Sequence, residues 1–161
     1  MKEVRCGGIR RALAILSLDD FDSRWRLMGL DVGVKTIGLA TGEPAIGLAT
    51  PLETIRRTKF TADAEHLIAT IGTHGIDALV IGLPINMDGS EGPRCQSMRQ
   101  VAANLLARRD LPIAFWDERL STAAVTRAMI EADVSRRKRA AAVDKLAASY
   151  ILQGAIDFLR R

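Results

Sequence analysis

The segment DALVIGL at residues 77–83 is, after its first acid, an unbroken run of apolar residues that ends at Pro84. A run of this length without polar alternation is typical of a strand that is covered on both faces. Other parts of the chain therefore have to cover both faces of the sheet that contains this strand. Its 161 residues are enough for one domain with such a core. Aromatic residues make up only 4% of the sequence, so we expect a core of Leu, Ile, Val and Ala.

The order of the other patterned segments predicts how these layers are arranged. Five segments have strand character: 26–33, 36–42, 45–56, 77–83 and 112–116. Four segments have the apolar spacing of helices: 62–75, 96–108, 121–132 and 140–159. We expect Thr61 to cap the first helix, Ser121 or Thr122 to cap the third, and the basic run SRRKR at 135–139 to be a linking segment. Three strands followed by alternating helices and strands predict an α/β fold, with a five-stranded mixed sheet and helices on both faces.

Residues 1–25 are expected to be an N-terminal extension that is loosely held or docks as a short helix, and 26–161 to form the domain. The short apolar run ALAIL in the extension is followed by the acidic LDDFD, which argues against a secretion signal. No apolar run approaches the length that spans a bilayer. The two cysteines, Cys6 and Cys95, form no CxxC pair and no cluster with the histidines. We therefore expect reduced thiols in a cytoplasmic protein and no zinc site.

Three acids stand where apolar residues are expected. Asp31 lies in the middle of the first apolar strand, and Glu118 follows the last strand directly, beside Asp117. Asp144 lies in the last helix, on the same face as Ala148 and the other apolar positions that should meet the sheet. A buried acid costs stability unless a compensating group faces it. Three such acids in separate elements suggest a shared purpose.

Carboxylates that repel one another stay ionised in a dry site only if cations neutralise them. Oxygen ligands of this kind suit the hard divalent ions Mg²⁺ and Mn²⁺, and two such ions can support phosphodiester cleavage. Ordinary structural roles also fit the spacing. Asp144 could instead pair with Arg137 or Lys138. Glu118 could pair with Arg119 or cap the helix that follows.

Four segments resemble, in order, motifs of the YqgF (RuvX) family. They are DVGVKTIGLA, IGLPINMDGSEGPR, FWDERLSTAAV and VSRRKRAAAVDKLAASYILQGAID, spread over residues 27–157. The resemblance implies a ribonuclease H-like fold. It also implies a nuclease that matures the 5′ end of pre-16S rRNA, or a Holliday junction resolvase that acts on branched DNA.

The same resemblance carries the family's catalytic and metal-binding acids onto Asp31, Glu118 and Asp144, each within one of the quoted motifs. It does not decide between Glu118 and its neighbour Asp117. Because adjacent strand residues point to opposite faces, only one of the two is expected to enter the site, and we favour Glu118. The one departure from the family pattern is Val34, where the family often has Thr. We expect little consequence at this loop position.

A second group of residues is expected to contact nucleic acid. The net charge of +4 and the pI of about 9.5 favour an anionic partner over a membrane surface. Glycines at 89 and 92 let backbone N–H groups approach an anion, and the basic run offers phosphate contacts that do not read sequence. Lys35 could equally be a solvated turn residue, and Arg119 a structural ion-pair partner. The candidates are Lys35, Thr36, Asn86, Ser90, Arg119, Arg136, Arg137, Lys138 and Arg139.

Two other functions fit parts of the sequence. A phosphotransferase or ATPase with an Asp-x-Gly phosphate turn would need a second, duplicated domain, and the chain has neither that length nor a Walker loop. A non-catalytic RNA-binding factor of ribosome assembly would use the basic face but would not need three acids. The sequence leaves open whether the substrate is branched DNA or precursor rRNA. In the second case the precursor of the small ribosomal subunit would be the partner. The sequence also leaves open whether the protein is a monomer or a homodimer, although two symmetric cuts in a junction would favour a dimer.

Overall fold

The computed structural model describes residues 15–120 and 136–161, without the side chains of 120 and 136–145. In this part of the chain a five-stranded sheet has the order β3-β2-β1-β4-β5. The strands are β1 (Leu27–Val32), β2 (Thr36–Glu43), β3 (Leu48–Arg56), β4 (Ala78–Leu83) and β5 (Ile113–Asp117). β1, β2 and β3 pair antiparallel, whereas β4 and β5 run parallel to β1. The expected α/β fold with a mixed sheet is confirmed, and the strands lie at the predicted segments.

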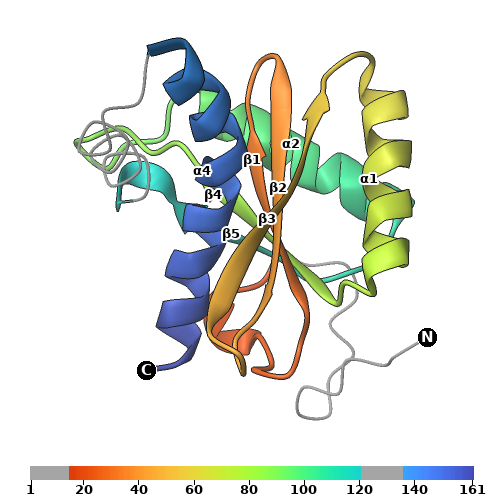
Figure 1. Ribbon diagram of the computed structural model, residues 1–161, viewed down its shortest axis with the longest axis vertical. Helices are drawn as coiled ribbons and strands as arrows, with labels where there is room; N and C mark the ends of the chain where they lie inside the picture. Colours follow the sequence, from red (N-terminus) through yellow and green to blue (C-terminus); the bar gives the residue numbers. More distant parts are fainter. Residues whose placement is uncertain (1–14, 121–135) are drawn as a thin grey trace.

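Helices cover both faces of this sheet (Figure 1). Helix α4 (Arg136–Leu159) covers one face, and α1 (Phe60–His74) and α2 (Pro93–Arg108) cover the other. Alternate residues of a strand point to opposite faces, so Leu30 of β1 packs with α1 and α2 while Leu27 packs with α4. Every residue of β4 is buried, which confirms the strand predicted to be covered on both faces. None of the described helices has the length and apolar character needed to cross a membrane.

A glycine lets α4 lie close to the sheet. A Cβ built on Gly29 of β1 would come within 2.7 Å of Leu152 Cβ and within 2.8 Å of the Ala148 carbonyl oxygen. A side chain at this position would therefore push α4 away from the strand. The helix crosses β1 at Gly29, two residues before Asp31.

The start of α1 differs from the sequence-based expectation. Thr61 is not its N-cap, because the helix already begins at Phe60. The carboxylate of Asp63 instead reaches back to Thr58 and accepts hydrogen bonds from its backbone N–H at 3.1 Å and its hydroxyl at 3.3 Å. The N-cap residue is Lys59, which makes no capping hydrogen bond through its side chain, and Asp63 instead ties the first turn to the segment before the helix. At the other end, Gly75 adopts a left-handed conformation with φ 61° and ends the helix.

Two later helices also begin earlier than expected. Helix α2 starts at Pro93 rather than at 96, since proline suits the first helical position, where its missing N–H costs nothing. Helix α4 starts at Arg136 rather than at 140. The basic residues 136–139 therefore form its first turn, and the prediction of a linking segment there was wrong, because Arg and Lys are good helix formers next to the alanines that follow. The predicted helix at 121–132 with its caps, and Ser135, lie outside the described residues.

The residues just before β1 pack against the domain. Leu18, the first residue of the short 3-10 helix η1 (Leu18–Asp20), and Phe21 are buried in the core beneath α4. Ile15 forms an isolated parallel bridge with Ile113 of β5. The extension is therefore in contact with the domain from residue 15 onward. Its first part, 1–14, lies outside the described residues, and a domain boundary after residue 25 stays a prediction.

Candidate active site

Asp31 lies near the carboxyl end of β1, on the face of the sheet that α4 covers. Leu27 and Gly29, at alternate positions of the same strand, face this helix, and the Asp31 side chain is half-buried. β4 and β5 run parallel to β1, so the segments that follow all three strands leave the sheet at one edge, here termed the carboxyl edge. Open α/β sheets bind their ligands at this edge.

Glu118 comes to the same edge and the same face. It is the first residue of the 3-10 helix η2 (Glu118–Leu120), which follows β5 directly. Its side chain lies over Gly82 of β4: a Cβ built on Gly82 would clash with Glu118 Oε1 and come within 2.9 Å of Glu118 Cγ. β4 lies between β1 and β5. Because Gly82 has no side chain, the Glu118 side chain can extend across β4 toward Asp31.

The Asp31 carboxylate influences the pKa of Glu118. Burial raises the pKa of Glu118 from 4.5 to about 7, and the Asp31 carboxylate adds to the rise. Arg94, in the first turn of α2, lowers the pKa of Glu118, and Asp117 raises it slightly further. Ionising both Asp31 and Glu118 is therefore unfavourable unless a cation compensates them.

Asp117 is engaged in a different interaction. Arg119 Nη2 donates to Asp117 Oδ2 at 2.6 Å, and Arg119 Nε donates to the same oxygen at 2.8 Å. These hydrogen bonds hold the pKa of Asp117 below its usual range. Trp116 packs on the α4 side of β5, so the next side chain, Asp117, leaves from the opposite face. Of the two adjacent acids, Glu118 is the one that faces Asp31.

Asp144 lies in α4, where the structure describes its backbone but not its side chain. Ala148 lies against Gly29 of β1. Residues four apart share one helix face, so position 144 lies on the sheet-facing side of α4, one turn before Ala148. The helix runs back along β1 toward the start of that strand, which places the earlier turn on the Asp31 side of Gly29.

The donor atoms at the carboxyl edge suit a hard divalent ion. Asp31 and Glu118 supply carboxylate oxygens only, the ligand type that Mg²⁺ and Mn²⁺ prefer. Among the side chains that the structure describes, no group of three acids, histidines or cysteines is placed to hold a metal. The third predicted ligand, Asp144, is not among those side chains. The described geometry thus brings together two members of the predicted triad.

The loop at 84–92 follows β4 and is held by its own polar groups. The Asn86 N–H donates to the Ser90 carbonyl at 2.9 Å, and Asn86 Nδ2 donates to the Ser90 hydroxyl at 3.1 Å. Asp88 Oδ1 accepts from the N–H and the hydroxyl of Ser90 at 2.9 and 2.6 Å. Gly89 takes a φ of 87° and donates to the Asn86 carbonyl at 2.8 Å. Asn86 and Ser90, which were predicted to contact nucleic acid, therefore bond to each other within the loop.

The turn between β1 and β2 carries Lys35 and Thr36. Lys35 is exposed, and Thr36 is the half-buried first residue of β2. Arg57, which follows β3, fixes this turn: its Nη1 donates to the Gly33 carbonyl at 2.7 Å and its backbone N–H donates to the Lys35 carbonyl at 2.8 Å. Lys35 thus lies in a constrained turn immediately after the strand that carries Asp31.

The remaining predicted contacts belong to α4. Its first turn contains Arg136, Arg137, Lys138 and Arg139, of which the structure describes the backbone. Figure 1 shows this turn at the same end of the molecule as the turn between β1 and β2. The basic run is therefore at the end of the molecule where the carboxyl edge lies.

Comparison with known proteins identifies the family. Residues 25–158 match the family model described as RuvX, Holliday junction resolvase. The chain belongs to the RuvX family. The resemblance carried by the four sequence motifs is thereby confirmed over nearly the whole domain.

Several relatives of this RuvX chain share one name. A protein of Paramagnetospirillum magneticum, named "Putative pre-16S rRNA nuclease", is 61% identical over 145 residues, which is 90% of each chain. A protein of Methylocella silvestris with the same name is 54% identical over 154 residues, covering 93% of this chain and 96% of that one. The likeness thus extends along nine-tenths or more of each of these relatives.

Solved structures of similar shape are far more distant in sequence. RuvC of T. thermophilus, in complex with a Holliday junction substrate, has a TM-score of 0.53 and 13% identity, covering 84% of this chain and 96% of that chain. Fowlpox virus resolvase, in complex with Holliday junction DNA, has a TM-score of 0.51 and 10% identity, with coverage of 84% and 99%. At such identities the likeness concerns the fold alone, and it confirms the expected ribonuclease H-like fold.

Two residues of the candidate site were not predicted from the sequence. Gly82 makes room for Glu118, and a glycine inside an otherwise apolar strand is a signal of close approach that could have identified it. Arg94 is the second residue of α2, and its charge lowers the pKa of Glu118. No sequence pattern indicates where that helix start lies relative to β5.

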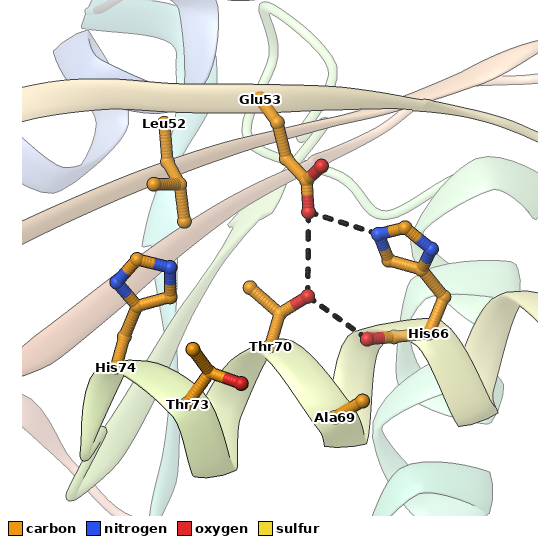
Figure 2. Close-up of a pocket in the computed structure, with 7 residues that line it drawn as sticks. All are labelled: Leu52, Glu53, His66, Ala69, Thr70, Thr73 and His74. Carbon is orange, nitrogen blue, oxygen red and sulfur yellow. Dashed lines mark hydrogen bonds and ion pairs between the residues drawn. The ribbon is translucent and has the colours of Figure 1, made fainter.

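A separate groove lies between β3 and α1 (Figure 2). His66 Nε2 lies 2.9 Å from Glu53 Oε1, and the Thr70 hydroxyl donates to the same oxygen at 3.3 Å. α1 packs on the sheet face opposite to α4, so this groove is remote from Asp31 and Glu118. His66, for which no chemistry was predicted, joins α1 to the edge strand.

Proposed function

We propose that the protein is a divalent-metal-dependent nuclease that hydrolyses phosphodiester bonds and processes the 5′ end of pre-16S rRNA. The proposal depends on one observation, the meeting of Asp31 and Glu118 on one face of the sheet across Gly82. Membership of the RuvX family supports a nuclease, and the name of the close relatives supports rRNA as the substrate.

Asp31, Glu118 and Asp144 are the residues that would hold the metal. When bound, Mg²⁺ or Mn²⁺ neutralises the acids, activates water and stabilises the leaving oxygen. The fold of the protein positions these three acids. β1 carries Asp31 on a buried strand, Gly82 seats Glu118, and the close packing of α4 at Gly29 brings position 144 to the same edge.

Basic and polar residues around the carboxyl edge would hold the phosphate backbone. Lys35 is exposed in a turn that Arg57 fixes, and Arg94 lies near enough to Glu118 to change its pKa. Such contacts position a strand without reading its sequence. The further proposed contacts are Thr36, Asn86, Ser90, Arg119, Arg136, Arg137, Lys138 and Arg139.

Branched DNA is the second candidate substrate, because the matching family model is described as a Holliday junction resolvase. Two symmetric cuts need two sites, so that function would favour a homodimer. Processing of rRNA needs one cut and is compatible with a monomer. It also implies a cytoplasmic protein whose partner is the precursor of the small ribosomal subunit.

Paired cleavage assays test the proposal. Wild type and Asp31→Asn are each given precursor rRNA with its 5′ extension and a synthetic four-way junction, with Mg²⁺, Mn²⁺ or a chelator. We expect wild type to cleave the rRNA only with metal, and Asp31→Asn to bind it without cleavage. Cleavage of the junction alone would select the second substrate. Cleavage that survives in Asp31→Asn would contradict the mechanism, and RNA binding by a wild type that never cleaves would indicate an assembly factor.

A further inference from the structure

The two most exposed large apolar side chains of the described residues both lie at the carboxyl edge. Met87 is 88% exposed and Val34 is 85% exposed. Ile46 and Leu48, at 68% and 61%, lie at the opposite end of the sheet, in and beside the turn between β2 and β3. A single exposed apolar side chain is common in soluble proteins. Two at one end of the sheet, in segments that follow strands of the proposed site, suggest a surface that contacts a ligand.

Both side chains lie in segments that directly follow strands of the proposed site. Val34 lies in the turn that follows β1, the strand of Asp31. Met87 lies in the loop that follows β4, the strand whose Gly82 seats Glu118. Because β1 and β4 are parallel neighbours, these two segments leave the sheet side by side. Val34 and Met87 together are named the apolar rim.

The segments that carry the apolar rim are held in place. In the loop of Met87, the polar side chains of Asn86, Asp88 and Ser90 form hydrogen bonds with one another or with the loop backbone. The loop thus uses its polar groups internally and leaves Met87 projecting into solvent. In the turn of Val34, the Gly33 carbonyl accepts a hydrogen bond from Arg57 at 2.7 Å. Both apolar side chains therefore extend from constrained backbone.

The surrounding charges indicate which ligand the rim meets. Lys35 follows Val34 directly and is exposed, and a Cβ on Gly89 of the Met87 loop would lie 3.9 Å from Arg119 Nη1. An apolar side chain beside cations that hold a phosphate backbone faces the bases or sugars of the strand. Methionine is among the side chains that insert between neighbouring bases and unstack them. A β-branched valine is stiff and can support a base from one side.

We propose that the apolar rim holds apart the bases that flank the scissile phosphate. Met87 inserts between two neighbouring bases, and Val34 supports the next base of the same strand. This inference rests on the proposed nuclease function and specifies its substrate class. The preferred substrate is a strand whose nucleotides at the cleavage position are unpaired or easily unstacked, rather than a continuous duplex.

Fluorescence of 2-aminopurine, placed beside the mapped cleavage position, tests this inference because the signal rises when the base is unstacked. The Asp31→Asn background keeps the strand intact. In that background, we expect a rise on binding that Met87→Ala abolishes and Met87→Leu retains, because leucine keeps the apolar volume. Val34→Ala should reduce the rise. Ile46→Ala is the matched control, since Ile46 is also exposed but lies at the far end of the sheet, and should leave the signal unchanged.

Cleavage by otherwise wild-type protein gives a second readout. Met87→Ala is expected to raise KM about tenfold, which corresponds to losing much of the burial of one methionine side chain. Unfolding midpoints should not change, because both rim side chains are exposed in the free protein. Equal fluorescence and equal KM for wild type and Met87→Ala would contradict the proposed role of the apolar rim. That outcome would not contradict the proposed nuclease function. Absence of cleavage by wild type would instead contradict the proposed function.

Discussion

Glu118 crosses β4 at Gly82, and its carboxylate takes up the space that a side chain at position 82 would need. β1 and β5 are separated by β4, so their backbones lie about 10 Å apart at the usual strand spacing. Acids that pointed straight out of β1 and β5 would be too far apart to share one small ion. The glycine removes the obstacle between them, and this makes Gly82 a positioning residue of the site.

Gly82→Ala is expected to reduce metal-dependent cleavage by about a hundredfold or more, because a misplacement of about 1 Å in a catalytic group can have that effect. The new methyl would also come within 2.6 Å of Ile151 Cδ1, so a loss of stability of about 1–3 kcal/mol should accompany it. Cleavage rates and urea unfolding of the same preparations measure both effects. The rate should fall even under conditions where the variant is fully folded.

Gly72→Ala is the matched control for this substitution. Gly72 lies within α1, and a Cβ there would meet nothing closer than Arg109 Nη1 at 4.0 Å. Alanine is a better helix former than glycine, so the control should be more stable by about 0.5–1 kcal/mol and cleave as wild type does. Equal losses of cleavage in both glycine variants would refute a special role for Gly82.

Arg57→Ala is expected to lower the free energy of unfolding by about 1–3 kcal/mol, because partly buried polar groups lose their donor. The Gly33 carbonyl loses a hydrogen bond of 2.7 Å, and the buried carboxylate of Asp63 loses a guanidinium whose Nε lies 3.8 Å away. Urea denaturation measures the loss, and substrate binding should weaken because the turn of Lys35 loosens. A double-mutant cycle with Asp63→Asn provides the check: strictly additive effects would show that the two side chains do not interact.

The stability of the metal-free protein should depend on pH through Glu118. Burial raises the pKa of Glu118 from 4.5 to about 7, so the folded state binds this proton more tightly than the unfolded chain. The contribution of Glu118 is therefore most favourable below pH 4.5, declines as the pH rises to about 7, and then stays constant. Glu118→Gln does not titrate, so in chelator its stability relative to wild type should rise across this window. Urea unfolding at about pH 5 and about pH 8 measures the change, and an equal difference at both values would contradict it.

Metal binding should be visible as stabilisation of the folded protein. Mn²⁺ in hundredfold excess over its Kd is expected to stabilise wild type by about 2.7 kcal/mol, because the unfolded chain does not hold the site. Asp31→Asn, Glu118→Gln and Asp144→Asn should lose this stabilisation. Asp117→Asn should keep it, since Asp117 is paired with Arg119 at 2.6 Å. Thermal unfolding with Mn²⁺ and with chelator distinguishes these cases. If Asp117→Asn lost the stabilisation by Mn²⁺ and Glu118→Gln retained it, Asp117 rather than Glu118 would be the metal ligand.

The fold was predictable because its signals are local. Runs of apolar residues and intervening glycines located all the strands of the described sheet, including the fully buried β4. Helix starts were less predictable, because a residue type that favours the N-cap position does not by itself fix where the helix begins. At α1 the N-cap is Lys59, whose side chain makes no capping hydrogen bond, rather than Thr61.

The site was predictable only where a residue breaks a local pattern. Asp31 is an acid in an apolar strand, and the structure places it near the carboxyl end of that strand. The crossing of Glu118 over Gly82 depends on the strand order, which brings together residues far apart in sequence. The loop of Asn86 and Ser90 shows a second limit. A polar side chain can bond to a ligand or to its own loop, and the sequence alone does not distinguish these partners.

α4 follows all five strands of the described sheet and covers the sheet face that carries Asp31 and Glu118. While a ribosome is still making the chain, all five strands can emerge before this helix is free to pack. A site that takes its third acid from α4 is therefore incomplete in every nascent chain that lacks the helix.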